Sequence, residues 1–108
     1  MNGNGNGNHA NTTYQYRDEQ GKVLYRKVRG FPKVFWFEHP DGIGGWDKGA
    51  KGIRRVPYRL PELLESTETV YITGGEKDAD TLVKQGLIAT TNDNGEGNWK
   101  PELNKFFK

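Results

Sequence analysis

The stretch VYITGGEKDADTLVKQGLIATT, residues 70–91, decides the fold of this chain. A short apolar run at 70–73 ends in a Gly-Gly turn, and the residues at 76–85 place their apolar side chains along one stripe of a helix. Gly86 is well placed to end that helix, and a second apolar run follows at 87–90. A strand, a helix and a strand in this order predict a parallel, right-handed crossover unit.

Upstream of this unit, the chain has the alternating pattern of short antiparallel strands. Aromatic and polar residues alternate at 14–17, and turn-forming residues follow at 18–21, which predicts a β-hairpin. We expect further strands or extended segments at 22–29, 33–38 and 53–58, the second of them aromatic or apolar on both faces. The glycine-rich stretch between the last two predicts an irregular loop.

These patterns divide the chain into three parts: an Asn/Gly tail at 1–11 expected to be disordered, a basic antiparallel β segment at 12–60, and a β-α-β-α segment at 61–108. Within the last part, proline in the first turn predicts a short helix at 61–65 and a final helix at 100–108. A chain of 108 residues suits a single compact domain, and thirteen aromatic side chains supply buriable surface. The predicted fold class is therefore α+β.

Charge is distributed unevenly along the chain. Residues 17–59 carry eleven Lys and Arg against five Asp and Glu, a net charge of +6, whereas residues 60–108 carry five Lys against nine acids, a net charge of −4. A basic first half of this kind can meet a polyanion. The alternative, that charges on both halves are simply solvated, stays open until the basic residues are known to share one face.

Composition also excludes several classes of site. The chain has no cysteine, which rules out disulfides and thiol nucleophiles, and its two histidines, His9 and His39, lack the spacing of metal ligands. We therefore expect no cofactor and no metal. No apolar run approaches the length of a membrane span, and the N-terminus lacks the pattern of an export signal, so we expect no membrane partner and a cytoplasmic protein.

Residues 70–91, with the Gly-rich loop and Trp99 that follow, resemble the opening of the TOPRIM domain in DNA primases of phages and mobile elements. Several upstream motifs resemble the segment that precedes TOPRIM in those proteins. They are the Tyr-x-Tyr-x-Asp-Glu-x-Gly pattern of 14–21, Lys33, Pro-Asp-Gly at 40–42, Gly-Gly-Trp at 44–46, and GIRRVPYRL at 52–60 followed by Pro-Glu-Leu at 61–63. The resemblance spans about residues 12–108. It implies a half-TOPRIM unit at 61–108 and a nucleic-acid partner.

The departures from the family pattern bear on catalysis. In the family, the first TOPRIM strand ends in a catalytic glutamate, whereas Gly74 stands at that position here; Gly75, the glycine expected for the turn, is retained. The family's later Asp-x-Asp metal site does not occur before Lys108, and no upstream cysteine segment is present. The resemblance therefore implies a degenerate TOPRIM turn formed by Gly74, Gly75, Glu76 and Asp78, and we expect no enzyme activity.

The remaining acidic residues of this turn do not form an obvious metal site. Glu76 and Asp78 are two positions apart on the predicted helix, so they point about 200° from each other and cannot hold one ion together. Their commoner role is favourable charge at a helix N-terminus. A magnesium-dependent nucleotidyl transfer or cleavage that uses Glu76 and Asp80 stays as the third-ranked hypothesis.

Binding is the better-supported role, and the basic segment supplies its candidate residues. Cationic grooves lined by rings hold single strands through phosphate contacts and base stacking. The candidate surface consists of Arg26, Lys27, Arg29, Lys33, Trp36, Trp46, Arg54, Arg55 and Arg59, with Phe35 and Phe37 nearby. In the alternative interpretation, the rings form the core of a small sheet and the arginines only solvate it.

We rank three function hypotheses. The first is a non-catalytic binding protein that acts on nucleic acid or a nucleoprotein complex, for example as a phage-encoded inhibitor of a Cas effector, that is, an anti-CRISPR protein; this version rests on size and resemblance. The second is a fragment or subunit of a replication primase that binds single-stranded DNA or RNA. The magnesium enzyme is third. A homodimer through an exposed edge of the short parallel sheet is also expected.

Overall fold

A computed structural model describes residues 11–32, 34–93, 103 and 106 of the chain. Its first half is a four-stranded antiparallel sheet whose strands lie in chain order: β2 (Thr12–Arg17), β3 (Val23–Arg29), β4 (Phe35–Pro40) and β5 (Trp46–Lys48). The predicted hairpin and the third strand are confirmed. The prediction of an irregular loop from 40 to 52 is wrong in part, because that stretch contains the short strand β5.

The turn between β4 and β5 explains how a glycine-rich stretch pairs as a hairpin. One carboxylate oxygen of Asp41 accepts the backbone N–H groups of Ile43 at 2.8 Å and Gly45 at 2.9 Å. The Asp41 N–H donates in turn to the Gly45 carbonyl at 3.1 Å. Gly42 and Gly44 have φ of +87° and +97°, a conformation that favours glycine. The glycine-rich composition, which predicted a loop, therefore forms a tight turn here.

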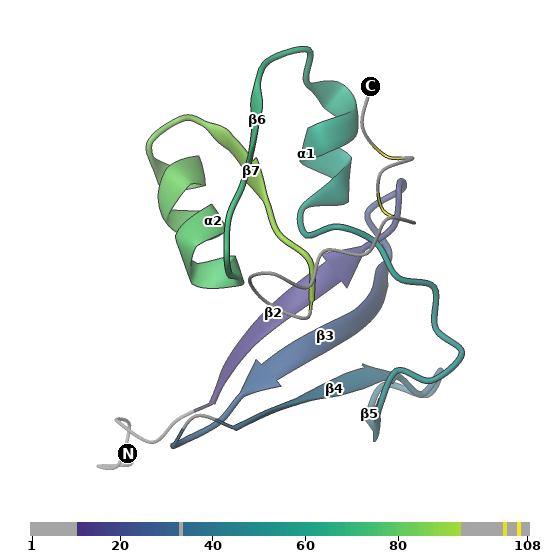
Figure 1. Cartoon of the computed structure of the whole chain (residues 1–108). Helices are drawn as coiled ribbons and strands as arrows, with labels where there is room; N and C mark the ends of the chain where they lie inside the picture. The colour runs from purple at the N-terminus through teal and green to yellow at the C-terminus, as the bar shows by residue number, and fades with distance from the viewer. Residues whose placement is uncertain (1–10, 33, 94–102, 104–105, 107–108) are drawn as a thin grey trace.

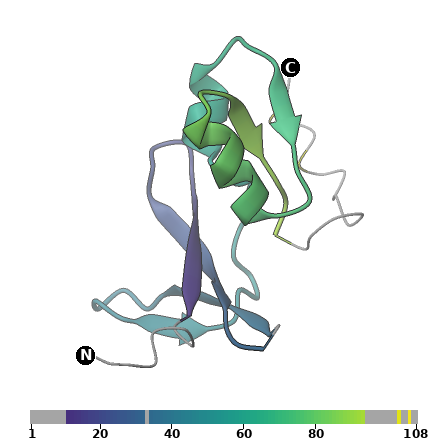
Figure 2. The ribbon, with the colours of Figure 1, turned by 90° about the vertical axis from the view of Figure 1, so that its left-hand side faces the viewer.

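The second half contains α1 (Leu60–Glu65), β6 (Val70–Ile72), α2 (Glu76–Lys84) and β7 (Ile88–Thr90). Strands β6 and β7 pair in parallel, with Val70 opposite Ile88, so the predicted strand–helix–strand crossover is confirmed. The two strands lie between α2 and α1 (Figure 1), and α2 stands in front of β7 when the molecule is turned by 90° (Figure 2). Gly86, at φ +88°, ends α2 as its position in the sequence predicts.

The segment that joins the two halves forms no strand. The expectation at 53–58 allowed a short strand or an extended segment, and the structure assigns no strand there. Its end is fixed to the end of β7: the Tyr58 N–H donates to the Thr91 carbonyl at 2.9 Å, and the Thr90 hydroxyl donates to the Tyr58 carbonyl at 2.6 Å. The predicted tail at 1–11 and final helix at 100–108 lie outside the described residues, apart from Asn11, Leu103 and Phe106.

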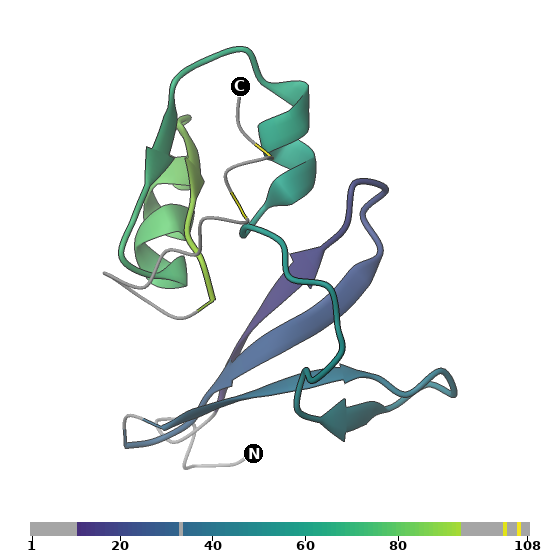
Figure 3. The same ribbon diagram turned by 45° about the vertical axis from the view of Figure 1, so that its right-hand side comes forward.

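The core lies where the sheet meets the helices. Tyr16 of β2 stacks on Tyr25 of β3 with ring centroids 4.8 Å apart and planes inclined by 8°, and Tyr58 packs against Tyr16 at 5.2 Å. Buried aliphatic side chains complete this cluster, among them Val56, Leu60, Leu63, Ala79 and Ala89. The helices gather at the β2 side of the sheet, and β4 and β5 extend away from them (Figures 1 and 3). The described chain is therefore one compact α+β domain.

Candidate nucleic-acid interface

Three tyrosine hydroxyls, two of the sheet and one of the joining segment, donate to three carboxylates of the second half. Each carboxylate also pairs with a lysine or arginine of the sheet or of the segment that leads into α1, and we call these three groups the docking triads. In the first, Tyr16 Oη donates to Glu76 Oε2 at 2.6 Å, and Lys27 Nζ lies 3.4 Å from the same oxygen. The Lys27 and Glu76 side chains are 3% and 2% exposed, so this pair is buried. Buried charges of this kind are tolerated because each has a charged or hydrogen-bonding partner.

The second docking triad lies at the end of β7. Tyr25 Oη and Arg55 Nη1 each donate to Asp93 Oδ2 at 2.7 Å, and the Asp93 side chain is 4% exposed. The Arg55 guanidinium also lies 5.2 Å from the centroid of the Tyr25 ring and 4.9 Å from that of Phe37. Arg55 therefore contributes to the contact between the sheet and the β7 end through both a charge and a ring contact.

The third docking triad joins the start of α1 to α2. Tyr58 Oη donates to Asp80 Oδ2 at 3.1 Å, and Arg59 Nε donates to Asp80 Oδ1 at 3.0 Å. Arg59 also pairs with Glu62. The first two triads pair a cation of the sheet or of the joining segment with a carboxylate of the second half, so part of the charge asymmetry along the chain stabilises the contact between the sheet and the second half. The third triad holds the start of α1 to α2.

Burial and the neighbouring carboxylates set the ionisation of these tyrosines. Desolvation raises the pKa of Tyr16, Tyr25 and Tyr58 well above the ordinary value of 10.0, and the carboxylate that accepts each hydroxyl raises it further. All three hydroxyls therefore stay protonated near neutral pH. They act as hydrogen-bond donors that hold the carboxylates in place.

The structure divides the basic surface predicted from sequence. The prediction that Lys27 belongs to the binding surface is wrong, because its side chain is buried against Glu76 and the Phe35 ring. A buried ammonium cannot contact a phosphate outside the protein. Arg55 and Arg59 belong to docking triads, and Arg54 forms an ion pair with Glu19 at 2.6 Å. Lys33 lies outside the described residues. The predicted residues therefore do not form one cationic groove.

The turn that the resemblance predicted to be a degenerate TOPRIM turn lines an open pocket of about 480 Å³. Gly74, Gly75, Glu76 and Asp78 line it together with Arg29 of β3, which is exposed. The expectation that the turn needs glycine at position 75 is wrong, because Gly75 has an extended φ of −168° and a Cβ there would meet nothing within 4 Å. Among the residues that the structure describes, no group of three or more His, Cys, Asp or Glu is placed to hold a metal ion.

Glu76 departs from the role expected for an acidic residue at a helix N-terminus. Both Glu76 and Asp78 lie in the first turn of α2, as predicted, and Asp78 is exposed. Glu76 is instead a buried member of the first docking triad. Its position in the sequence could not show this, because its partners Tyr16 and Lys27 are about fifty residues or more away along the chain.

Two tryptophans and their cations share the sheet face turned away from the docking triads, which we call the outer face. Strand register places Arg26 opposite Glu38, and Glu38 opposite Lys48. The Arg26 guanidinium lies 3.8 Å from the centroid of the Trp46 ring, and Lys48 Nζ lies 5.7 Å from that of Trp36. Both tryptophans are partly exposed. The outer face therefore combines stacking surfaces with positive charge, as single-strand binding requires.

Glu38 holds the side chains of Arg26 and Trp36 in place on the outer face. One of its oxygens accepts Arg26 Nε at 2.8 Å and Nη2 at 2.6 Å, and the other accepts the Trp36 indole N–H at 3.0 Å. The hydrogen bonds from Trp36 and then Arg26 lower the pKa of Glu38 below its ordinary value of 4.5. Neither Glu38 nor Lys48 was among the predicted site residues. Alternation along each strand is the signal that could have placed them beside Arg26 and Trp36.

The turn between β3 and β4 carries a separate apolar patch. Phe31, Val34 and Phe35 are 63%, 46% and 49% exposed. Gly30 permits this tight turn, because a Cβ there would lie 3.0 Å from Val34 and 3.1 Å from the Trp36 ring. Exposed apolar clusters mark contact sites more often than scattered single residues do. This patch adjoins the outer face without being part of it.

Comparison of the chain with protein-family models, curated proteins and solved structures gave no match. The resemblance to TOPRIM primases therefore rests on the residues of this chain alone. In the part of the chain that the structure describes, no helix is long and apolar enough to cross a membrane. Strand β6 pairs with β7, and Tyr71 and Ile72 on it are exposed, so the predicted dimer through a sheet edge stays a prediction.

Proposed function

We propose that this chain is a non-catalytic module that holds single-stranded nucleic acid on the outer face of its sheet. The observation that carries the proposal is the pairing of Trp36 and Trp46 with Arg26 and Lys48 on that face. Each base offers a flat face to an indole, whatever its identity, and the cations meet the phosphates between bases. Recognition of this kind is tolerant of sequence.

The non-catalytic part of the proposal is supported by the hydrogen bonds and ion pairs that already occupy the candidate metal-binding carboxylates. Glu76 and Asp80, the carboxylates of the enzyme hypothesis, each accept a tyrosine hydroxyl and pair with a cation. Magnesium binding at Glu76 would have to break the ion pair between β3 and α2, and magnesium binding at Asp80 would have to break the ion pair between the start of α1 and α2. Phosphoryl transfer needs carboxylates that are open to the ion, and these side chains are committed to the fold.

The charge of the outer face sets an expectation for its salt dependence. Of the two cations paired with the tryptophans, Arg26 is held by Glu38, whereas Lys48 has no carboxylate within ion-pair distance among the described residues. A protein that neutralises few phosphates releases few counterions, and its affinity falls gently with salt. We therefore expect binding to be driven mainly by stacking, with a shallow salt slope.

The test is a titration of tryptophan fluorescence with an oligothymidylate of about ten nucleotides at low salt. We expect quenching, and we expect Trp46→Ala and Trp36→Ala each to weaken binding by about 5- to 100-fold, the range for loss of one base–aromatic stack. Tyr71→Ala removes an exposed ring from β6 and serves as the control that leaves affinity unchanged. If neither DNA nor RNA strands bind, or if the tryptophan variants bind like the control, the proposal fails.

A second candidate function is supported by the apolar patch at Phe31, Val34 and Phe35. Such a patch suits a protein partner better than a strand, so we also propose that the chain docks onto a nucleic-acid-handling complex, such as a Cas effector, and inhibits it. Phe31→Ser should abolish inhibition of that complex and leave strand binding intact. Equal inhibition by Phe31→Ser and the unchanged protein would exclude this patch as the contact.

A further inference from the structure

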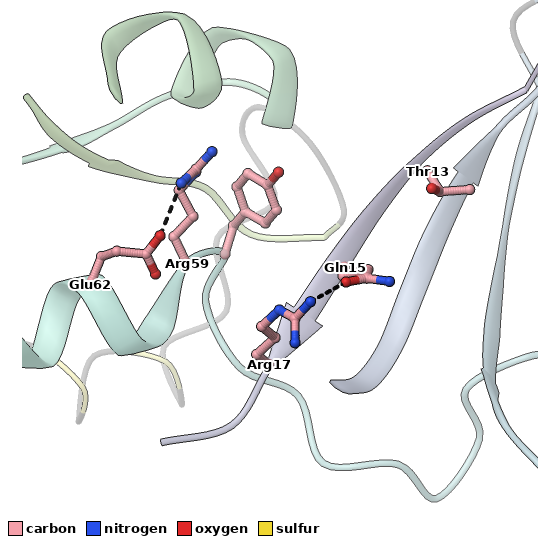
Figure 4. A pocket seen from close by; sticks show the side chains of 6 residues that line it. Thr13, Gln15, Arg17, Arg59 and Glu62 are labelled. Carbon is pink, nitrogen blue, oxygen red and sulfur yellow. Dashed lines mark hydrogen bonds and ion pairs between the residues drawn. The ribbon is translucent and has the colours of Figure 1, made fainter. Parts of the chain in front are cut away.

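A polar pocket of about 280 Å³ opens beside strand β2, at the edge of the outer face. Thr13, Gln15 and Arg17 of β2 form one side, and Tyr58, Arg59 and Glu62 form the other (Figure 4). Register places Gln15 opposite Arg26, so the β2 side of the pocket continues the face that carries the two tryptophans. A strand lying across the sheet would reach this pocket at its end.

Arg59 presents one replaceable donor to the pocket. Its Nε and Nη2 lie 3.0 Å and 2.8 Å from Asp80 Oδ1, inside the third docking triad, whereas its Nη1 donates to Glu62 Oε2 at 2.9 Å. The Asp80 side chain is 28% exposed and also accepts the Tyr58 hydroxyl, but Glu62 is 48% exposed. The inner carboxylate therefore fixes the guanidinium, and the outer one is held by a single exposed contact, which is weak in water.

The backbone at Arg59 supports a functional interpretation of this arrangement. Arg59 has φ of 62° and ψ of 41°, a left-handed conformation that side chains other than glycine rarely adopt. Strained backbone of this kind persists where its surroundings fix it, and it gathers at ligand sites. Here it turns the arginine side chain toward Asp80 and the pocket.

Arg17 supplies the second cation. Its Nη1 donates to the Gly21 carbonyl at 2.8 Å and its Nη2 donates to the Gln15 side-chain oxygen, both of which are uncharged acceptors. The side chain is exposed on the pocket's β2 side (Figure 4). Two guanidinium groups thus approach one pocket from opposite sides, and Glu62 is the carboxylate among its lining residues. Arginine forks are suited to phosphate oxygens, which accept two parallel hydrogen bonds.

We propose that this pocket binds a phosphate monoester, held by Arg17 and by Nη1 of Arg59, and that Glu62 is a built-in competitor that the phosphate displaces. The monoester is either the 5′-phosphate of a strand on the outer face or the phosphate of a free mononucleotide. For the strand, the inference rests on the proposed function. For the free mononucleotide, it stands by itself.

The experiment compares three ligands: a 5′-phosphorylated oligothymidylate, the same strand with a 5′-hydroxyl, and thymidine 5′-monophosphate, the last followed by calorimetry. We expect the 5′-phosphate to tighten strand binding by about tenfold, the contribution of a charge-assisted pair. Glu62→Gln should tighten binding of both phosphate ligands by several-fold. Arg17→Gln should erase the preference for the 5′-phosphate and leave the 5′-hydroxyl strand unaffected.

Matched controls remove the same charges elsewhere. Glu65→Gln makes the same change on an exposed residue of α1, and Lys84→Gln removes a cation from an exposed position on α2; neither should alter the preference. Both strands binding equally, with no response to Glu62→Gln or Arg17→Gln, would overturn the pocket and leave the proposed function standing. Binding of the mononucleotide without either strand would support the pocket and overturn the proposed function. No binding of any of the three ligands would overturn both.

Discussion

Replacing Lys27 by methionine should lower the free energy of unfolding by about 3 kcal/mol, at the lower end of the cost of removing one partner from a buried ion pair. Two unit charges 3.4 Å apart, as Lys27 Nζ and Glu76 Oε2 are, attract by about 5 kcal/mol at an effective dielectric constant of about 20. Desolvation of both groups offsets part of that attraction in the intact protein. Methionine keeps the apolar stem but leaves the Glu76 carboxylate buried with the Tyr16 hydroxyl as its remaining partner of the triad.

The assay is urea unfolding followed by circular dichroism, with the free energy in water obtained by linear extrapolation. A loss of about 3 kcal/mol is a large part of the 5–15 kcal/mol typical of a domain, and it should lower the Tm by roughly 10 to 20 °C. Lys22→Met is the matched control, because Lys22 is exposed in the β2–β3 turn; its effect should stay within about 0.5 kcal/mol.

A double variant separates the buried charge from the lost contact. Lys27→Met combined with Glu76→Gln removes both charges and keeps an amide oxygen that can accept the Tyr16 hydroxyl. We expect it to regain at least about 1 kcal/mol over Lys27→Met alone, as coupled neighbours do. A loss below about 1 kcal/mol for Lys27→Met, with no recovery in the double variant, would refute the reasoning that these charges join the two halves.

Three further predictions follow from the same contacts. Tyr25→Phe leaves the buried Asp93 carboxylate without one of its donors, and chemical denaturation should show a loss of about 1–3 kcal/mol; a neutral result would mean that Arg55 suffices. Because the folded pKa of Glu38 is lowered, its hydrogen bond to the Trp36 indole is present above pH 4.5 and is lost as pH falls through that lowered pKa; tryptophan fluorescence should change in that acidic window and stay flat in Glu38→Gln. Light scattering should give the mass of a dimer that Ile72→Lys, on the exposed side of β6, reduces to a monomer; a monomeric mass for the unchanged protein would remove the predicted sheet-edge dimer.

Local patterns predicted most of the secondary structure. The crossover at 70–91 was readable because apolar periodicity changes from strand to helix and back, and because Gly86 adopts the positive φ that ends a helix. Strand β5 was missed because it spans three residues, too few for any alternation to be seen, inside a stretch where glycine predicts a loop. The Gly-Gly pair predicted a turn that needs glycine, but Gly75 has an extended backbone that any residue can adopt.

The candidate site was predictable in composition but not in arrangement. Arg26, Trp36 and Trp46 do share one face, as the sequence hypothesis of a basic aromatic surface required. Lys27 is the neighbour of Arg26 in sequence, yet alternation along β3 turns it to the opposite face, where it is buried. A charge count along the chain could not distinguish Arg26 from Lys27, because it carries no information on which face of a strand is covered.

By itself, the sequence determined what depends on neighbouring residues: the longer strands, the crossover helix, the turn at Asp18, the end of α2, and the imbalance of charge between the halves. The tertiary structure alone decided how that charge is used, because the tyrosine–carboxylate hydrogen bonds join residues 60, 68 and 22 positions apart. The sequence does not distinguish a glutamate exposed to water from one that is buried beside a lysine. Their difference arises only when packing removes the water and brings the distant partner within reach.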